Sequence, residues 1–241
     1  TFNALTANGG SSTSFGSGLT VTTDTGKLAL NSISITSAGA LTLAGETGID
    51  FADGVTFTAG GDLSMSTTSG DVAGAGAFTL ASTGDISLSE NLTTAGATVI
   101  TADSDGNGTG DFSINASTTL STGNNSLTLT ANDVTLSGSI SSGTGSTTVA
   151  VSDGGTIGLG GTSGGMTITG TELGNITAGT LNIGNSSTGN ITVDGISAAN
   201  SNNATTINLT TASASSVSFS NNASTFQALA VSSGSGIDQG V

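Results

Sequence analysis

Apolar and small polar residues alternate along this chain in short phrases that recur at a nearly constant interval. GDLSM at 61–65, GDISL at 84–88 and GDFSI at 110–114 each place two apolar side chains around one polar residue. This period of two is typical of a strand with one buried face. Less literal copies are ALTL at 40–43, VTLS at 134–137, GTIGL at 155–159, GTLNI at 179–183 and TINL at 206–209.

The apolar residues that open these phrases define a first series of strand starts. The intervals between them are 22, 22, 23, 26, 22, 23, 24 and 26 residues. A fixed period in this range indicates a repeat architecture, in which each repeat packs on its neighbours. The first series is Leu19, Leu41, Leu63, Ile86, Phe112, Val134, Ile157, Leu181 and Ile207.

Two further apolar series share this period, so we expect three short strands in each repeat. Gly, Asn, Asp and Ser pairs separate the strands, as at Gly60-Gly61 and Asn124-Asn125, and these residues accept the positive φ of tight corners. The second series is Leu28, Ile49, Val72, Leu92, Leu120, Ile140, Met166, Ile191 and Val217. The third series is Ile33, Val55, Phe78, Val99, Leu127, Val149, Leu173 and Ile196.

The three series predict an all-β fold: a single, three-sided parallel β-helix, or β-solenoid, over 1–241 with about 22–26 residues per coil and nine to ten coils. Each strand would pair with its equivalent one coil later, about 4.8 Å along the axis. An antiparallel sandwich is one alternative, but it does not require every third strand to look alike. Disorder is the other, yet disordered tracts have no reason to space aliphatic residues regularly.

Composition constrains the partners as well as the fold. The chain has no Pro, which strands paired on both sides exclude, and no Cys to form disulfides or thiolate metal sites. Sixteen acidic residues against Lys27 alone give a net charge of −15, which predicts no nucleic-acid partner and disfavours an anionic membrane surface. No apolar run approaches the ~18 residues of a spanning helix, so we expect no membrane insertion.

The termini indicate one unit of a longer tandem array. TFNAL at 1–5 resembles TFQAL at 225–229, although Leu229 fits the third series better than the first. Neither end has an amphipathic or charged capping segment, and residue 1 is Thr. We therefore expect a processed product or an internal piece whose open ends stack on neighbouring repeats or on another copy.

The GDLSM, GDISL and GDFSI phrases and the stretch GTIGLGGTSGG at 155–165 resemble the repeat region of filamentous-haemagglutinin-type adhesins. They also resemble the giant Gly/Ser/Thr-rich bacterial surface proteins that are similar to those adhesins. The resemblance covers most of the chain and implies a right-handed β-helix, secreted across the outer membrane, that serves in adhesion or matrix building. The secretion motif of that family contains Pro, so this Pro-free chain resembles the shaft rather than the secretion domain.

We expect no enzymatic activity. The chain has no His, Arg, Tyr, Trp or Cys, so a Ser nucleophile has no evident base and a polysaccharide-cleaving cleft has no aromatic lining. The Gly-rich runs at 104–110 and 154–165 lack the Gly-Lys-Ser/Thr ending of a phosphate loop. These runs are therefore interpreted as turns.

One acidic stretch is a candidate calcium site. Its polar residues alternate as in an EF-hand loop, with Gly108 at the sharp turn, and it lies in one of the two 26-residue intervals. Position 12 of the loop is Ile114 instead of a bidentate Glu, and the alternative is an acidic corner insertion that binds nothing. The candidate ligands are Asp103, Asp105, Asn107, Thr109 through its carbonyl, and Asp111.

Thr pairs in LTVT at 19–22, LTLT at 127–130 and MTIT at 166–169 resemble the flat Thr arrays of ice-binding solenoids, but the predicted register places them on different faces. We therefore expect a structural, extracellular protein of the bacterial cell surface, either an adhesin shaft or a subunit of a filament or matrix fibre. The alternatives are an adhesin module for host ligands or cell-surface glycans, and an ice-binding solenoid. The lack of an aromatic or basic patch favours the shaft.

Overall fold

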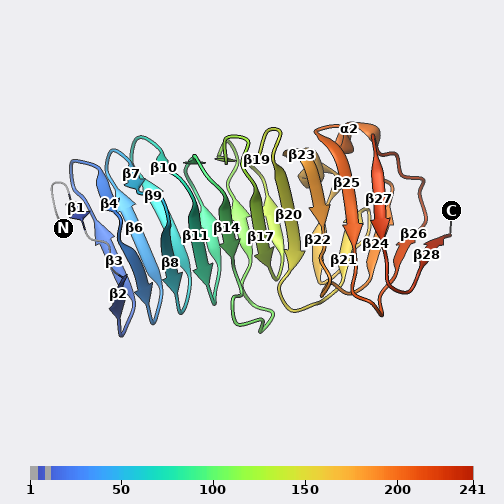
Figure 1. Cartoon of the computed structure of the whole chain (residues 1–241), viewed down its shortest axis with the longest axis horizontal. Coiled ribbons are helices and arrows are strands. Elements are labelled where there is room, and N and C mark those ends of the chain that lie inside the picture. The colour runs from blue at the N-terminus through green and yellow to red at the C-terminus, as the bar shows by residue number, and fades with distance from the viewer. Residues whose placement is uncertain (1–4, 9–11, 241) are drawn as a thin grey trace.

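The computed structural model describes residues 5–8 and 12–240, and this part of the chain is all-β with two short helices (Figure 1). Its strands pair in parallel and stack in about ten turns of about 22 residues. This confirms the predicted β-solenoid.

The strands form four sheets, numbered here after the apolar series that predicted them. The first sheet holds β3 (Leu19–Thr22), β6 (Leu41–Gly45), β9 (Leu63–Thr67), β12 (Ile86–Leu88), β15 (Phe112–Ile114) and β18 (Val134–Leu136). The second sheet holds β1 (Leu5–Asn8), β4 (Leu28–Asn31), β7 (Ile49–Phe51), β10 (Val72–Gly74), β13 (Leu92–Thr94), β16 (Thr119–Ser121), β19 (Ser139–Ser141) and the start of β23 (Ile176–Ile183).

The other two sheets differ in how far they extend. The third sheet holds β2 (Ser12–Phe15), β5 (Ser34–Ser37), β8 (Val55–Ala59), β11 (Phe78–Ser82), β14 (Thr98–Thr101), β17 (Leu127–Ala131), β20 (Ser146–Val151), the end of β23, β25 (Ala204–Thr210) and β27 (Leu229–Ser232). The fourth sheet holds, in spatial order, β22 (Met166–Ile168), β21 (Ile157–Gly160), β24 (Ile191–Asp194), β26 (Val217–Phe219) and β28 (Ile237–Gln239). Only the third sheet runs along nearly the whole described chain.

The predicted three-sided coil is confirmed as far as β20. In the first sheet the ladder runs in register from Leu19 to Val134. In the second sheet it runs in register from Leu28 to Ile140.

The third series marks β8, β11, β14, β17 and β20, but Ile33 lies one residue before β5 and Val149 pairs with Leu129 instead of Leu127. Val99 faces outward and is 38% exposed.

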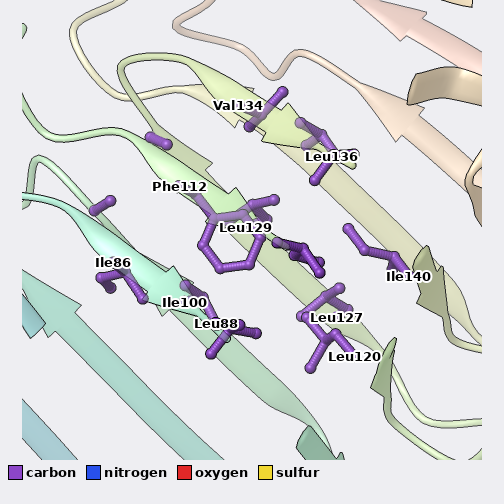
Figure 2. Close-up of a cluster of buried hydrophobic side chains, with 14 of the residues drawn as sticks. Ile86, Leu88, Ile100, Phe112, Leu120, Leu127, Leu129, Val134, Leu136 and Ile140 are labelled. Carbon is purple, nitrogen blue, oxygen red and sulfur yellow. The ribbon is translucent and has the colours of Figure 1, made fainter. Parts of the chain in front are cut away.

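Aliphatic side chains from three sides fill the lumen. Figure 2 shows Ile86 of the first sheet, Ile100 of the third and Leu120 of the second within one buried cluster. Nearer the N-terminal end, the rings of Phe51 and Phe78 stack with centroids 3.9 Å apart. Because every coil adds equivalent inward positions, the core is a narrow column that needs few large residues.

Hydroxyl groups occupy inward positions where strands meet at a corner. The buried side chains of Thr94 and Thr98 bond at 2.6 Å, and those of Ser142 and Thr147 at 2.9 Å. In the described part of the chain, no buried side-chain nitrogen or oxygen lacks a partner. These pairs let the chain turn without leaving a polar atom unsatisfied in the lumen.

The regular coil breaks after β20, and the starts Leu181 and Ile207 of the first series are wrong, because they pair with each other in the third sheet. Ile157 lies in the fourth sheet, which adjoins β18 of the first sheet through β22. A five-residue connection at 161–165 joins β21 to β22, which lies parallel to β21 on the side facing β18. The loop packs on the backbone at Gly158, where a Cβ atom would overlap Ser163.

The late members of the other two series are also wrong. In the second sheet Ile140 is followed by Ile176 rather than by Met166. The misplaced residues of the second series, all in the fourth sheet, are Met166, Ile191 and Val217. Those of the third series, which lie outside any strand, are Leu173 in α1 (Gly170–Gly174) and Ile196 just before α2 (Ala198–Ser201).

A capping box explains why a helix replaces the expected strand at Leu173. The Thr169 hydroxyl accepts a hydrogen bond from the Glu172 N–H at 3.2 Å, and the Glu172 carboxylate accepts one from the Thr169 N–H at 2.9 Å. This reciprocal pair satisfies two free donors at the start of α1. The helices α1 and α2 contact each other, and beyond β23 the second sheet has no further strand in the described chain.

Two further predictions concern register. LTVT at 19–22 lies in the first sheet, LTLT at 127–130 in the third and MTIT at 166–169 in the fourth, so the three Thr pairs occupy different faces as expected. Leu229 lies in β27 of the third sheet, which confirms its place in the third series. Residues 1–4 of the TFNAL phrase lie outside the described residues.

Candidate functional site

The predicted calcium stretch forms the connection between β14 and β15. This loop extends beyond the neighbouring corners of the solenoid (Figure 1). Three of its residues have positive φ, namely Asp103 at 55°, Gly106 at 66° and Gly108 at 79°. The backbone therefore folds back on itself within a few residues.

Asp103 is the hydrogen-bonding centre of the loop. Its side chain is buried, and its carboxylate accepts hydrogen bonds from the Asn107 N–H at 2.9 Å and the Gly108 N–H at 3.0 Å. The Ser152 hydroxyl donates a third. Burial raises the pKa of Asp103, but the hydrogen bonds from Ser152, Gly108 and Asn107 outweigh it and hold the pKa below its ordinary value of 3.8.

The other predicted ligands bond to one another or to the next coil. Asn107 donates its side-chain N–H to Asp105 at 2.9 Å, and the Thr109 hydroxyl donates to the Asn107 side-chain oxygen. Asp111 instead accepts from the side chain of Asn132 at 2.9 Å. The structure thus gathers the first four ligands in one loop and directs the fifth away.

In this arrangement, protein donors already occupy oxygens that a calcium ion would need. Calcium needs six to eight convergent oxygen ligands, whereas the oxygens of Asp103 and Asn107 already accept hydrogen bonds from protein donors. Within residues 5–8 and 12–240, no group of three or more His, Cys, Asp or Glu side chains is placed to hold a metal ion. The calcium site stays a prediction of the sequence, which titration calorimetry at millimolar calcium would decide.

An acidic ladder, which we define as Asp62, Asp85, Asp111 and Asp133, follows the corner that leads into the first sheet. The Asp62 carboxylate accepts from the Asp85 N–H at 3.1 Å, and that of Asp85 from the Asp111 N–H at 2.9 Å. Asp111 accepts in turn from the Asp133 N–H at 3.1 Å. Each carboxylate thereby ties its own coil to the next. In the sequence, three members of this ladder are marked by the Gly-Asp pair that opens GDLSM, GDISL and GDFSI. From the sequence alone, we interpret these phrases only as strands.

The seam, which we define as the junction of β18 with β22 and α1, is held by side chains. Asp133 accepts from the Thr167 N–H at 2.8 Å, and Glu172 accepts from the Leu136 N–H at 3.0 Å. Asn175 donates to the Leu136 carbonyl at 2.8 Å. Burial raises the pKa of Asp133, and the nearby negative charges of Asp111 and Glu172 raise it further, which outweighs the hydrogen bonds it accepts.

A cavity lies near each end of the described solenoid. A cavity of about 140 Å³ near the N-terminal end is lined by Thr13, Phe15, Leu19, Val21, Leu30, Ile33 and Ile35. One of about 270 Å³ near the C-terminal end is lined by Phe219, Ala223, Ser224, Phe226, Leu229 and Gln239. Both linings are mainly apolar.

The fold defines the class of this chain as a β-solenoid repeat protein. Comparisons with protein families, with curated proteins and with solved structures give no significant match. None of the helices in the described residues is long and apolar enough to cross a membrane.

Proposed function

We propose that the chain is a structural, non-enzymatic shaft segment of the bacterial cell surface, acting in an adhesin, a filament or an extracellular matrix fibre. The observation that carries this proposal is the third sheet, a single parallel ladder from β2 to β27. A ladder of this length transmits tension through backbone hydrogen bonds and resists bending. The resemblance of the GD phrases to adhesin repeats also supports a shaft.

The partner in this proposal is a further coil of the same kind. Within the described residues β27 pairs only with β25, and β28 pairs only with β26. A coil from the same parent protein or from a second copy can pair with these strands and bury the apolar end cavity. Ile237, 51% exposed on β28, is an apolar side chain at this end.

Electron microscopy with diffraction on the native material tests the shaft. We expect an axial repeat near ~4.8 Å that continues across subunit boundaries. Ile237→Asp places a charge on the terminal edge and should shorten the filaments, whereas Val99→Asp, at an exposed apolar residue on the side, should not. Separate short rods, or equal effects of both substitutions, would overturn end-to-end assembly.

A further inference from the structure

The outward face of the third sheet carries two straight columns of mostly Thr residues. Bridge pairing places equivalent positions of β5, β8, β11, β14, β17 and β20 directly in line. The first column is Thr56, Thr79, Val99, Thr128 and Thr148. The second column is Thr36, Thr58, Ala81, Thr101, Thr130 and Ala150.

These Thr columns form a regular grid of hydroxyl and methyl groups. Neighbouring coils are about 4.8 Å apart, and the two columns, which lie two residues apart on each strand, are separated by roughly 6.6 Å. β-Branched side chains have restricted χ1 rotation, so the hydroxyls keep fixed positions. Of the three Thr pairs noted in the sequence, only Thr128 and Thr130 lie on the third sheet and belong to this grid, and the observed register supplies their neighbours.

The hydroxyls of the Thr columns are available to a partner. In the described chain they make one hydrogen bond to protein, in which the Asn182 side chain donates to the Thr148 hydroxyl at 3.2 Å. The other seven Thr hydroxyls of the columns have no bond to protein. A row of unsatisfied, ordered donors and acceptors holds water in register or binds a surface that presents the same spacing.

Charge is excluded from this face. All sixteen acidic residues and Lys27 lie outside the ten strands of the third sheet, although the chain carries a net charge of −15. The acidic ladder lies instead at the corner between the third and first sheets. The end cavities are lined by residues outside the Thr columns. The same holds for two grooves, one lined by residues 117–119, 137–139 and Asn175 and the other by residues 22–23, 44–46 and 66–68.

The partner must therefore be uncharged and periodic. A small molecule needs a concave pocket, and a polysaccharide needs an aromatic platform, which a chain without Tyr or Trp lacks. A second copy laid on this face would bury few apolar atoms, because Val99 is the only exposed large apolar side chain in the Thr columns. A crystal of water presents neutral donors and acceptors in a lattice with repeats of the same order as the Thr grid.

We propose that the Thr columns of the third sheet bind ice. The hydroxyls hydrogen-bond to lattice oxygens, and the methyl groups occupy the spaces between them and exclude liquid water. This activity is separate from the shaft, because end-to-end assembly uses strand edges and the Thr columns lie on the side of the rod.

The experiment measures how much of the purified full chain is incorporated into a slowly growing ice hemisphere. A fluorophore on Lys27, which lies between β3 and β4 and away from the third sheet, reports the protein in the ice. We expect the native chain to enter the ice and Thr128→Glu to lower the incorporated fraction several-fold. Thr135→Glu, which changes an exposed Thr on β18 of the first sheet, is the matched control and should behave as the native chain.

Thr58→Tyr, on another coil of the Thr columns, provides a second test if Thr128→Glu does not fold, and circular dichroism checks each variant. Exclusion of the native chain from ice would overturn the proposal. An equal loss in Thr128→Glu and Thr135→Glu would also overturn it, because the effect would then be general charge repulsion. If the native chain did not enter the ice and Thr128→Glu changed its sedimentation, the Thr columns would be assigned to contacts between copies instead. Filament formation in the shaft experiment is independent of each result.

Discussion

The coils up to β20 and the coils from β21 onward share parallel strand pairing but differ in repeat length and cross-section. In the first region Leu41 pairs with Leu63, 22 residues later, on one of three short-stranded sides. In the second region Leu181 pairs with Ile207, 26 residues later, but β23 is eight residues long and a helix stands where a strand of the second sheet stood. Parallel strand pairing therefore fixes the axial rise per coil and leaves the length and the shape of the coil open.

The largest effect should come from removing a core side chain in each region. Leu129→Ala and Leu209→Ala both truncate fully buried Leu residues of the third sheet, and each should cost about 2–5 kcal/mol of unfolding free energy. Because each coil contacts mainly its neighbours, the damage should stay on one side of the seam. Hydrogen exchange measured by mass spectrometry should show faster exchange in the coils before the seam for Leu129→Ala and after it for Leu209→Ala. Acceleration of the same amides by both substitutions would show that the regions unfold as one unit.

A smaller effect is expected at the seam itself. Glu172→Ala removes the capping box of α1 and leaves the Leu136 N–H without its partner, which should cost about 2 kcal/mol locally. Glu172→Gln keeps an acceptor oxygen and should lose less than half of that. Amide exchange at Leu136 and in α1 is the measurement, with Glu46→Ala as the control acidic residue. Unchanged exchange at Leu136 in Glu172→Ala would refute this account of the seam.

The smallest expected effect is a difference in pKa among three aspartates, Asp103, Asp133 and Asp194. Side-chain hydrogen bonds from Asn222 and Asn221 lower the pKa of Asp194, and those on Asp103 lower its pKa below 3.8. The folding stability that the ionised carboxylates of Asp103 and Asp194 contribute is present above pH 3.8. It is lost as the pH falls through their lowered folded-state pKa. Asp133 has the opposite sign, because its raised pKa means that protonation favours the folded state and that this contribution is lost as pH rises.

Carboxyl chemical shifts followed by NMR between neutral and strongly acid pH should therefore show Asp133 titrating first as the pH falls. Asp103 and Asp194 should follow. Asp133→Asn should remove the first transition and leave the other two in place. If Asp133 titrated together with Asp194, the seam would be no more desolvated than the ordinary corner that holds Asp194.

The sequence predicted the solenoid because the inward positions from Leu19 to Val134 repeat without a slip. It did not predict the seam. A parallel return normally needs a crossover of about a dozen residues, and the connection at 161–165 has only five. The period of the apolar residues continues through this region, so Met166 was assigned to the wrong side.

For the site, the sequence predicted which residues share the Asp103 loop but not which atoms they bind. Alternating Asp and Asn residues satisfy a calcium pattern and a self-bonded turn equally well, and only the hydrogen-bond partners distinguish the two. Thr169 and Glu172 have the spacing of a capping box, a signal in the sequence that would have indicated α1. The Thr columns escaped notice because they depend on which strands lie side by side.

The position of β22 has a consequence for how the chain is built. A solenoid whose N-terminal end folds first can add each new strand to the strand already in place. This order of addition holds as far as β20. The strand β22 follows β21 in the chain but lies between β21 and β18 along the axis. When β21 arrives, the position beside β18 is still empty, and it is filled only after the Gly-rich return at 161–165 has formed. Assembly from the N-terminal end therefore has one step at which a later strand must be inserted behind an earlier one.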